Sequence, residues 1–70
     1  MQSTFMITVN GQQREVRSGA SLAELVVELG LSSAAIAVEK NHKLVRPRDH
    51  AATALERGDE IEVVTLVGGG

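Results

Sequence analysis

The dipeptide Asn10-Gly11 constrains the fold of this chain more than any other feature, because it separates two segments that both have the pattern of strands. In the first segment the large apolar residues Phe5, Ile7 and Val9 occupy alternate positions. A period of two predicts a strand with one buried face. Asn and Gly both tolerate the positive φ angles that a two-residue type I′ turn requires. We therefore predict a β-hairpin whose second strand runs from about Gln12 to Val16.

A helical period follows in the segment SLAELVVELGLSS. Positions i, i+3, i+4 and i+7 are apolar, as expected for the buried side of a helix: Leu22, Leu25, Val26 and Leu29. Ser21 and Glu24 have the spacing of a capping box, in which each residue satisfies a free backbone N–H of the other. Gly30 suits the left-handed position that ends a helix, and Leu31 suits the apolar contact beyond it. These signals predict a helix from Leu22 to Leu29.

The remaining sequence favours three further strands. One is centred on Ile36 and Val38, and a short one at Leu44-Val45 is stopped by Pro47, which cannot donate to a β-ladder. Residues 48–59 have a mixed pattern that includes a helical turn. The last strand then places alternate residues on one face: Ile61, Val63, Thr65 and Val67.

The predicted order is two strands, a helix and three strands. A single helix most simply covers one face of a mixed sheet of four or five strands, which is the α+β β-grasp arrangement seen in ubiquitin. Phe5 is the only aromatic residue, so we expect an aliphatic core that includes Phe5 and the apolar side of the helix. We place the β-grasp domain at residues 1–66 and a flexible tail at residues 67–70, because glycine adds nothing to a core and chain ends are commonly disordered.

Composition argues against several classes of function. A chain of 70 residues is one domain, and its net charge of −2 argues against nucleic acid as the main partner. The absence of cysteine excludes a disulfide framework, a zinc-finger-type site and a thiol nucleophile. We see no signal-peptide pattern and no apolar run near the ~18 residues of a membrane span, and therefore expect a cytoplasmic protein that does not act at a membrane.

Three stretches of sequence, together with the chain length, resemble the ThiS family of sulfur carriers in thiamin thiazole biosynthesis: IAVEKN, LVRPR and GDEIEVVTLVGGG. The resemblance spans essentially the whole chain, and its most specific part is a final strand that runs directly into glycines. The chain departs from the family in one place. The family's usual short segment is Val-Pro-Arg, whereas this chain reads Val45-Arg46-Pro47-Arg48, with one extra residue.

The resemblance implies that the C-terminal carboxylate of Gly70 is the reactive group. An E1-like adenylyltransferase would join this carboxylate to AMP from ATP. A sulfur donor such as a cysteine desulfurase would then displace AMP and leave a thiocarboxylate on Gly70, whose sulfur passes to the thiazole built on thiazole synthase. Val67, Gly68 and Gly69 would be the part of the tail that enters the partner's channel, where glycine lets a backbone approach closely.

On this interpretation the chain is the substrate of the E1-like adenylyltransferase and is not itself an enzyme. We expect it to supply no catalytic residue, no metal ligand and no bound cofactor, and to be a monomer when free. Two alternatives stay open: a sulfur carrier of another pathway, resembling the small subunit of molybdopterin synthase (MoaD), and a plain β-grasp interaction module. Removal of Gly69 and Gly70 would change nothing in the module but would abolish modification of either carrier.

The last strand also offers a candidate docking surface. Glu60 and Glu62 alternate outward, and the same face continues with Val64 and Leu66. An exposed apolar end to this row, next to the tail, suits contact with the adenylating enzyme. The alternative is that neighbouring strands or loops cover Val64 and Leu66.

The other charged residues and the histidines have a simpler interpretation. His42 and His50 are the only histidines, and neither is paired by motif with a carboxylate or thiol, so we expect both at the surface. Positive charge is concentrated in the second half of the chain, where we expect a solvated face: Lys40, Lys43, Arg46, Arg48 and Arg57.

Overall fold

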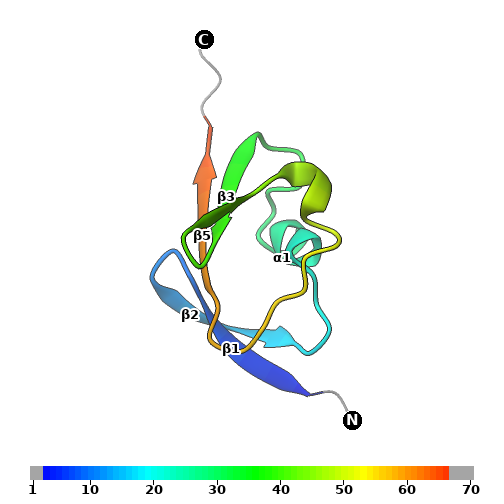
Figure 1. Cartoon of the computed structure of the whole chain (residues 1–70), viewed down its shortest axis with the longest axis vertical. Coiled ribbons are helices and arrows are strands. Elements are labelled where there is room, and N and C mark those ends of the chain that lie inside the picture. Colours follow the sequence, from blue (N-terminus) through cyan, green and yellow to red (C-terminus); the bar gives the residue numbers. More distant parts are fainter. Residues whose placement is uncertain (1–2, 67–70) are drawn as a thin grey trace.

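A computed structural model describes residues 3–66, which form a five-stranded sheet with one α-helix against one of its faces (Figure 1). The elements are, in order, β1 (Thr4–Val9), β2 (Gln12–Arg17), α1 (Leu22–Glu28), β3 (Ile36–Lys40), β4 (Lys43–Val45), the 3₁₀ helix η1 (Pro47–Asp49) and β5 (Glu60–Thr65). Across the sheet the strands are ordered β2-β1-β5-β3-β4, so the last strand is the central one. The predicted α+β β-grasp fold is confirmed.

The hairpin of β1 and β2 forms as predicted, because Asn10 and Gly11 adopt positive φ angles of 51° and 82°. Asn10 also connects this hairpin to the centre of the sheet. Its Nδ2 donates to the Val63 carbonyl oxygen at 3.2 Å, and its Oδ1 accepts the Val63 N–H at 2.8 Å. Since β1 and β5 are in parallel register at only two residue pairs, these two bonds extend a short contact between the strands.

Helix α1 begins with the predicted capping box. The Glu24 N–H donates to Ser21 Oγ at 3.1 Å, and the Ser21 N–H donates to Glu24 Oε1 at 2.8 Å. The helix ends one residue earlier than predicted, with Leu29 as its C-cap and Gly30 at a φ of 76°. The N–H groups of Gly30 and Leu31 donate to carbonyls of the last turn at 2.9 and 3.1 Å, which is a Schellman motif. No helix in residues 3–66 is long and apolar enough to cross a membrane.

The core lies between α1 and the sheet and is aliphatic, as predicted. Within the described residues it consists of Ile7, Val9, Val16, Ala20, Leu22, Leu25, Val26, Val38, Leu55, Ile61 and Val63. Phe5, predicted to lie in the core, packs against the core but is only partly buried. The reason is its place on β1: the register pairs of β1 with the central strand involve Thr8 and Val9, whereas Phe5 pairs with β2.

A buried carboxylate links the β3–β4 turn to the loop before β5. Asp59 is buried, and its carboxylate accepts the Glu56 N–H at 2.7 Å and Asn41 Nδ2 at 3.0 Å. Lys40 Nζ lies 3.6 Å from the same carboxylate and 3.4 Å from that of Glu56. The Lys40 side chain is therefore only 18% exposed, and its prediction as part of a solvated face is wrong. The other four predicted cations, Lys43, Arg46, Arg48 and Arg57, are exposed.

The segment Val45-Arg46-Pro47-Arg48 lies where β4 passes into η1. Val45 ends β4, Arg46 is extended with φ −66° and ψ 147°, and Pro47 opens η1. Extended backbone is the conformation that a following proline favours. The β3–β4 register remains regular up to Val45, which pairs with Val38, so the extra residue leaves strand pairing intact.

Candidate functional site

The carboxyl end of β5 is where the described fold meets the predicted reactive tail. β5 pairs with β3 over five residues and with β1 over two. Beyond the strand, the Leu66 N–H still donates to the Ala35 carbonyl oxygen at 2.8 Å. The chain is therefore held up to the last described residue. The rest of the predicted site lies outside the described residues: Val67, Gly68, Gly69 and Gly70.

We call the sheet face away from α1 the outer face. Along each strand, the residues of this face alternate with residues that point into the core. Val64, near the carboxyl end of β5, and Leu66, one residue beyond the strand, are 58% and 53% exposed. No segment within residues 3–66 covers them, so the first of the two sequence-based alternatives, an exposed apolar end, is correct for the described part of the chain. Val64 lies directly opposite Ala37 of β3, which extends the apolar surface across one strand. We call Val64 and Leu66 the apolar end of the outer face.

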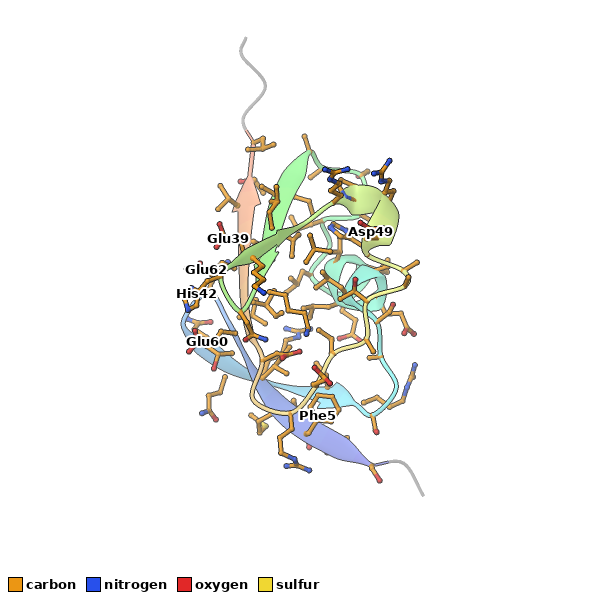
Figure 2. The ribbon with its side chains drawn as sticks, in the orientation of Figure 1. Phe5, Glu39, His42, Asp49, Glu60 and Glu62 are labelled. Carbon is orange, nitrogen blue, oxygen red and sulfur yellow. The ribbon has the colours of Figure 1, made fainter. Side chains whose placement is uncertain are left out.

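The opposite end of the same face is acidic. Glu62 of β5 pairs directly with Glu39 of β3, and Glu60 lies two positions before Glu62 on the same side of β5. His42, in the β3–β4 turn, places Nε2 3.2 Å from Glu60 Oε1. Figure 2 shows these four side chains gathered on the side of the sheet away from α1. We call Glu39, His42, Glu60 and Glu62 the acidic end.

The two histidines have opposite environments. His42 is exposed, as predicted. His50 is only 7% exposed, so its prediction as a surface residue is wrong. Its Nε2 lies 3.0 Å from the Val45 carbonyl oxygen, and its own backbone oxygen accepts the Ala23 N–H at 3.1 Å. His50 therefore ties the turn after η1 to both β4 and α1, which is a structural role that its polar sequence neighbours did not indicate.

A groove of about 500 Å³ lies between α1, the α1–β3 connection and the region of η1. Its lining is mainly apolar and includes Val26, Leu31, Ile36 and Leu66, with His50 at one side. Leu66, one residue beyond β5, also lines this groove, so the groove extends to the carboxyl end of the sheet. Sequence reasoning missed the groove because its walls come from segments that only the tertiary fold brings together.

Comparison with known proteins fits this arrangement of a β-grasp body and a final strand that leads into glycines. The sequence model of the ThiS family matches residues 7–70. The chain belongs to the ThiS family. The match covers nearly the whole chain and includes the last strand, the apolar end of the outer face and the glycines after it.

A solved structure has the same fold. The thiamine biosynthesis protein (ThiS) of Geobacter metallireducens superposes with a TM-score of 0.80 and 29% sequence identity, covering 94% of this chain and 100% of that one. This likeness extends the family assignment from the sequence to the three-dimensional arrangement of the helix and the five strands.

Two curated relatives of this ThiS-family chain are much longer than it is. The thiazole synthases of Paramagnetospirillum magneticum and Magnetococcus marinus are 34% and 36% identical to it over 64 residues. Each match covers 91% of this chain but only 20% of the relative, so the chain spans about a fifth of their length.

Proposed function

We propose that this ThiS-family protein is a sulfur carrier for thiazole formation in thiamin biosynthesis, and that it carries the sulfur as a thiocarboxylate on Gly70. The observation that carries this proposal is the family match, which continues through the glycines to residue 70. The likeness to a thiamine biosynthesis protein supports the pathway.

The proposed chemistry takes place in two steps at one carboxyl group. An oxygen of the Gly70 carboxylate attacks the α-phosphorus of ATP in an E1-like adenylyltransferase, which forms an acyl-adenylate and releases pyrophosphate. A sulfur nucleophile then attacks the carbonyl carbon and AMP departs with the C–O bond electrons. With hydrosulfide as the nucleophile the products are the thiocarboxylate, AMP and one proton. The partner enzyme supplies the ATP site, so the carrier acts as a substrate and not as an enzyme.

The fold suits a chain whose end must enter another protein's active site. β5 is held by strands on both sides, and the hydrogen bond from Leu66 to Ala35 extends this support past the strand. The tail therefore starts from a fixed position relative to the apolar end of the outer face. An enzyme that binds Val64 and Leu66 would therefore hold the position at which the described chain ends, at Leu66. Exposed apolar patches are typical of such docking surfaces.

Thiazole synthase is the proposed acceptor of the sulfur. In two thiazole synthases, a segment of about one fifth of the chain is similar to this protein. A carrier-like segment within the same chain as a synthase supports a functional link between the two, because covalent linkage raises the effective concentration of one for the other. A cysteine desulfurase is the proposed source of the sulfur.

Intact mass spectrometry with thiol-selective alkylation tests the proposal. The untagged protein is incubated with ATP, a ThiS-family adenylyltransferase and sulfide, and we expect a gain of about 16 Da as sulfur replaces one oxygen. Oxidation of Met1 or Met6 gives the same nominal mass, but only the thiocarboxylate reacts with an alkylating reagent, since the chain has no cysteine. The label should map to Gly70.

Two matched variants control this experiment. A chain that ends at Gly68 and a chain with one alanine added after Gly70 keep the whole described fold but lack the proposed carboxylate. Both should gain no label. Labelling of either variant, or no labelling of the wild type by an adenylyltransferase that is active on its own carrier, would contradict the proposal. Transfer of the sulfur to a thiazole by thiazole synthase then separates the thiamin pathway from that of a MoaD-like carrier.

A further inference from the structure

We propose that Glu39, His42 and Glu62, at the acidic end of the outer face, bind a divalent transition-metal ion of the Zn²⁺ type. One ligand atom from each of these three side chains lies within 4.8 Å of the other two. The inference concerns the isolated protein and does not rest on the proposed sulfur-carrier function.

Strand pairing and a fixed turn bring the three residues together. Glu39 and Glu62 are direct partners in the β3–β5 register. The β3–β4 turn that carries His42 is attached to the start of β5 by Asn41, whose N–H donates to the Glu60 carbonyl oxygen at 2.7 Å and whose Oδ1 accepts the Glu60 N–H at 2.9 Å. His42 is therefore held beside β5 although it lies 20 positions before Glu62 in the sequence.

The charges at this end favour a bound cation. Like charges directly opposite each other on neighbouring strands are destabilising, and Glu39 faces Glu62. Within residues 3–66, neither of these two carboxylates forms an ion pair with a lysine or arginine. The nearest lysine in sequence, Lys40, points its Nζ to Glu56 and Asp59 instead. A divalent ion between the carboxylates would convert this repulsion into attraction.

The imidazole distinguishes this group from an ordinary acidic patch and selects the class of metal. Mg²⁺ and Ca²⁺ prefer oxygen ligands alone, whereas Zn²⁺ and related ions bind imidazole together with carboxylates. Two ligand atoms of a tetrahedral Zn²⁺ ion lie about 3.4 Å apart, as follows from metal–ligand distances near 2.0–2.1 Å. The ligand atoms lie within 4.8 Å of one another, so binding would require the three side chains to move closer together. Three protein ligands leave one position open to solvent.

The fourth residue of the acidic end suits a supporting role. Glu60 Oε1 lies 3.2 Å from His42 Nε2. A carboxylate that accepts the N–H of a metal-binding imidazole orients the ring and raises its basicity. Occupancy of the site would also remove much of the negative charge from the outer face, two positions along β5 from Val64.

Isothermal titration of untagged protein with ZnCl₂ tests the site directly. We expect saturable binding of one ion per chain that a large excess of Mg²⁺ does not displace. His42→Asn should weaken binding at least about tenfold, the lower limit seen even for residues that only support a ligand. Asparagine is chosen because His42 has a φ of 70°, which asparagine tolerates better than alanine. Glu62→Gln should weaken binding in the same way.

Glu15→Gln provides the matched control. Glu15 pairs with Met6 on the outer face, but β1 separates β2 from β5, so this substitution should leave binding unchanged. In NMR spectra of the wild type, Zn²⁺ should shift the ring signals of His42 and leave those of the buried His50 in place. No saturable binding below about 1 mM Zn²⁺, equal binding by folded His42→Asn, or displacement by Mg²⁺ would overturn the proposal.

Discussion

The two faces of the same sheet have opposite chemistry. Along β5 the inward residues Ile61 and Val63 are buried, whereas their neighbours Glu60, Glu62 and Val64 are exposed. The inward set packs against α1, and Figure 1 shows that the helix lies on one side of the sheet only. Because successive residues of a strand point to opposite faces, one face can be selected for stability and the other for recognition without conflict.

The outer face is itself divided along the strand direction. Its acidic end lies at the β3–β4 turn, and its apolar end lies where β5 leads toward the glycines. A uniformly apolar core face increases the stability of the fold, because its residues pack against the apolar side of one helix. A face that meets other molecules can instead place different chemistry at each end. The inner face of the sheet therefore contains residues that stabilise the fold, and the outer face contains those proposed to bind an enzyme or an ion.

The largest expected effect comes from comparing a leucine-to-alanine substitution in the core, on the buried side of α1, with one on the outer face of the sheet. Leu25→Ala, at a residue that is 1% exposed, should lower the free energy of unfolding by about 2–5 kcal/mol, because it removes buried methyl groups and leaves a cavity. Leu44→Ala, at an outer-face residue that is 67% exposed, should cost less than about 1 kcal/mol. Urea denaturation of both variants measures the difference.

Leu44 is the control because, like Leu25, it is a leucine, but its side chain is exposed and not buried. If Leu44→Ala were as destabilising as Leu25→Ala, the outer face would also carry part of the stability of the domain. The division of the sheet into a structural face and a recognition face would then be wrong.

The next effect should appear in modification and not in stability. Val64→Asp places a charge in the apolar end of the outer face, and it should reduce the rate of thiocarboxylate formation by at least about tenfold, equivalent to ~1.4 kcal/mol of lost binding. The variant should remain folded, with a loss of less than about 1 kcal/mol, because Val64 is exposed and only strand propensity changes. Mass spectrometry follows the rate, and circular dichroism follows the fold.

Met6→Asp is the matched control for Val64→Asp. Met6 is 42% exposed and lies on the outer face, but on β1, which pairs only with the start of β5 at Glu60 and Ile61. We expect this variant to be modified at the wild-type rate. Wild-type modification of Val64→Asp, or unfolding of that variant, would contradict docking at the apolar end.

Local signals in the sequence were enough to predict most of the fold. The Asn10-Gly11 turn and the capping box of Ser21 and Glu24 involve residues only a few positions apart, so a local sequence pattern is enough to predict them. The helix end at Gly30 was predicted to within one residue for the same reason. Alternation also assigned the buried and exposed residues of β5 from Glu60 to Val63, whereas the exposure of Val64 was left open.

Features that depend on distant segments were not predicted. His50 has polar neighbours in sequence, but the fold places it against the Val45 carbonyl and buries it. Lys40 was expected in solvent, but the loop before β5 supplies it with two carboxylates. The convergence of His42 with Glu62 requires the β3–β5 register, which no local pattern contains. Gly70 was singled out by family resemblance, since a glycine has no side-chain chemistry of its own.

The smallest expected effect lies at the exposed start of the helix whose apolar side forms the core. The Ser21 N–H, which donates to the Glu24 carboxylate, lowers the pKa of Glu24 below its ordinary value, and the Arg17 guanidinium at 3.1 Å adds to this effect. A lowered pKa in the folded state contributes stability above the unfolded-state pKa of about 4.3, and this contribution is lost as pH falls through the folded-state pKa. Glu24→Gln keeps a capping side chain but removes the charge, so it should be slightly less stable than the wild type at pH 7, and the difference should shrink as the pH falls to 3. Ser21→Ala removes the other side chain of the capping box and should lower the free energy of unfolding by about 0.5–2 kcal/mol at both pH values. Thermal unfolding of the three proteins at the two pH values measures these differences. A deficit of Glu24→Gln that was as large at pH 3 as at pH 7 would mean that the shape of the side chain, and not its charge, stabilises the start of α1.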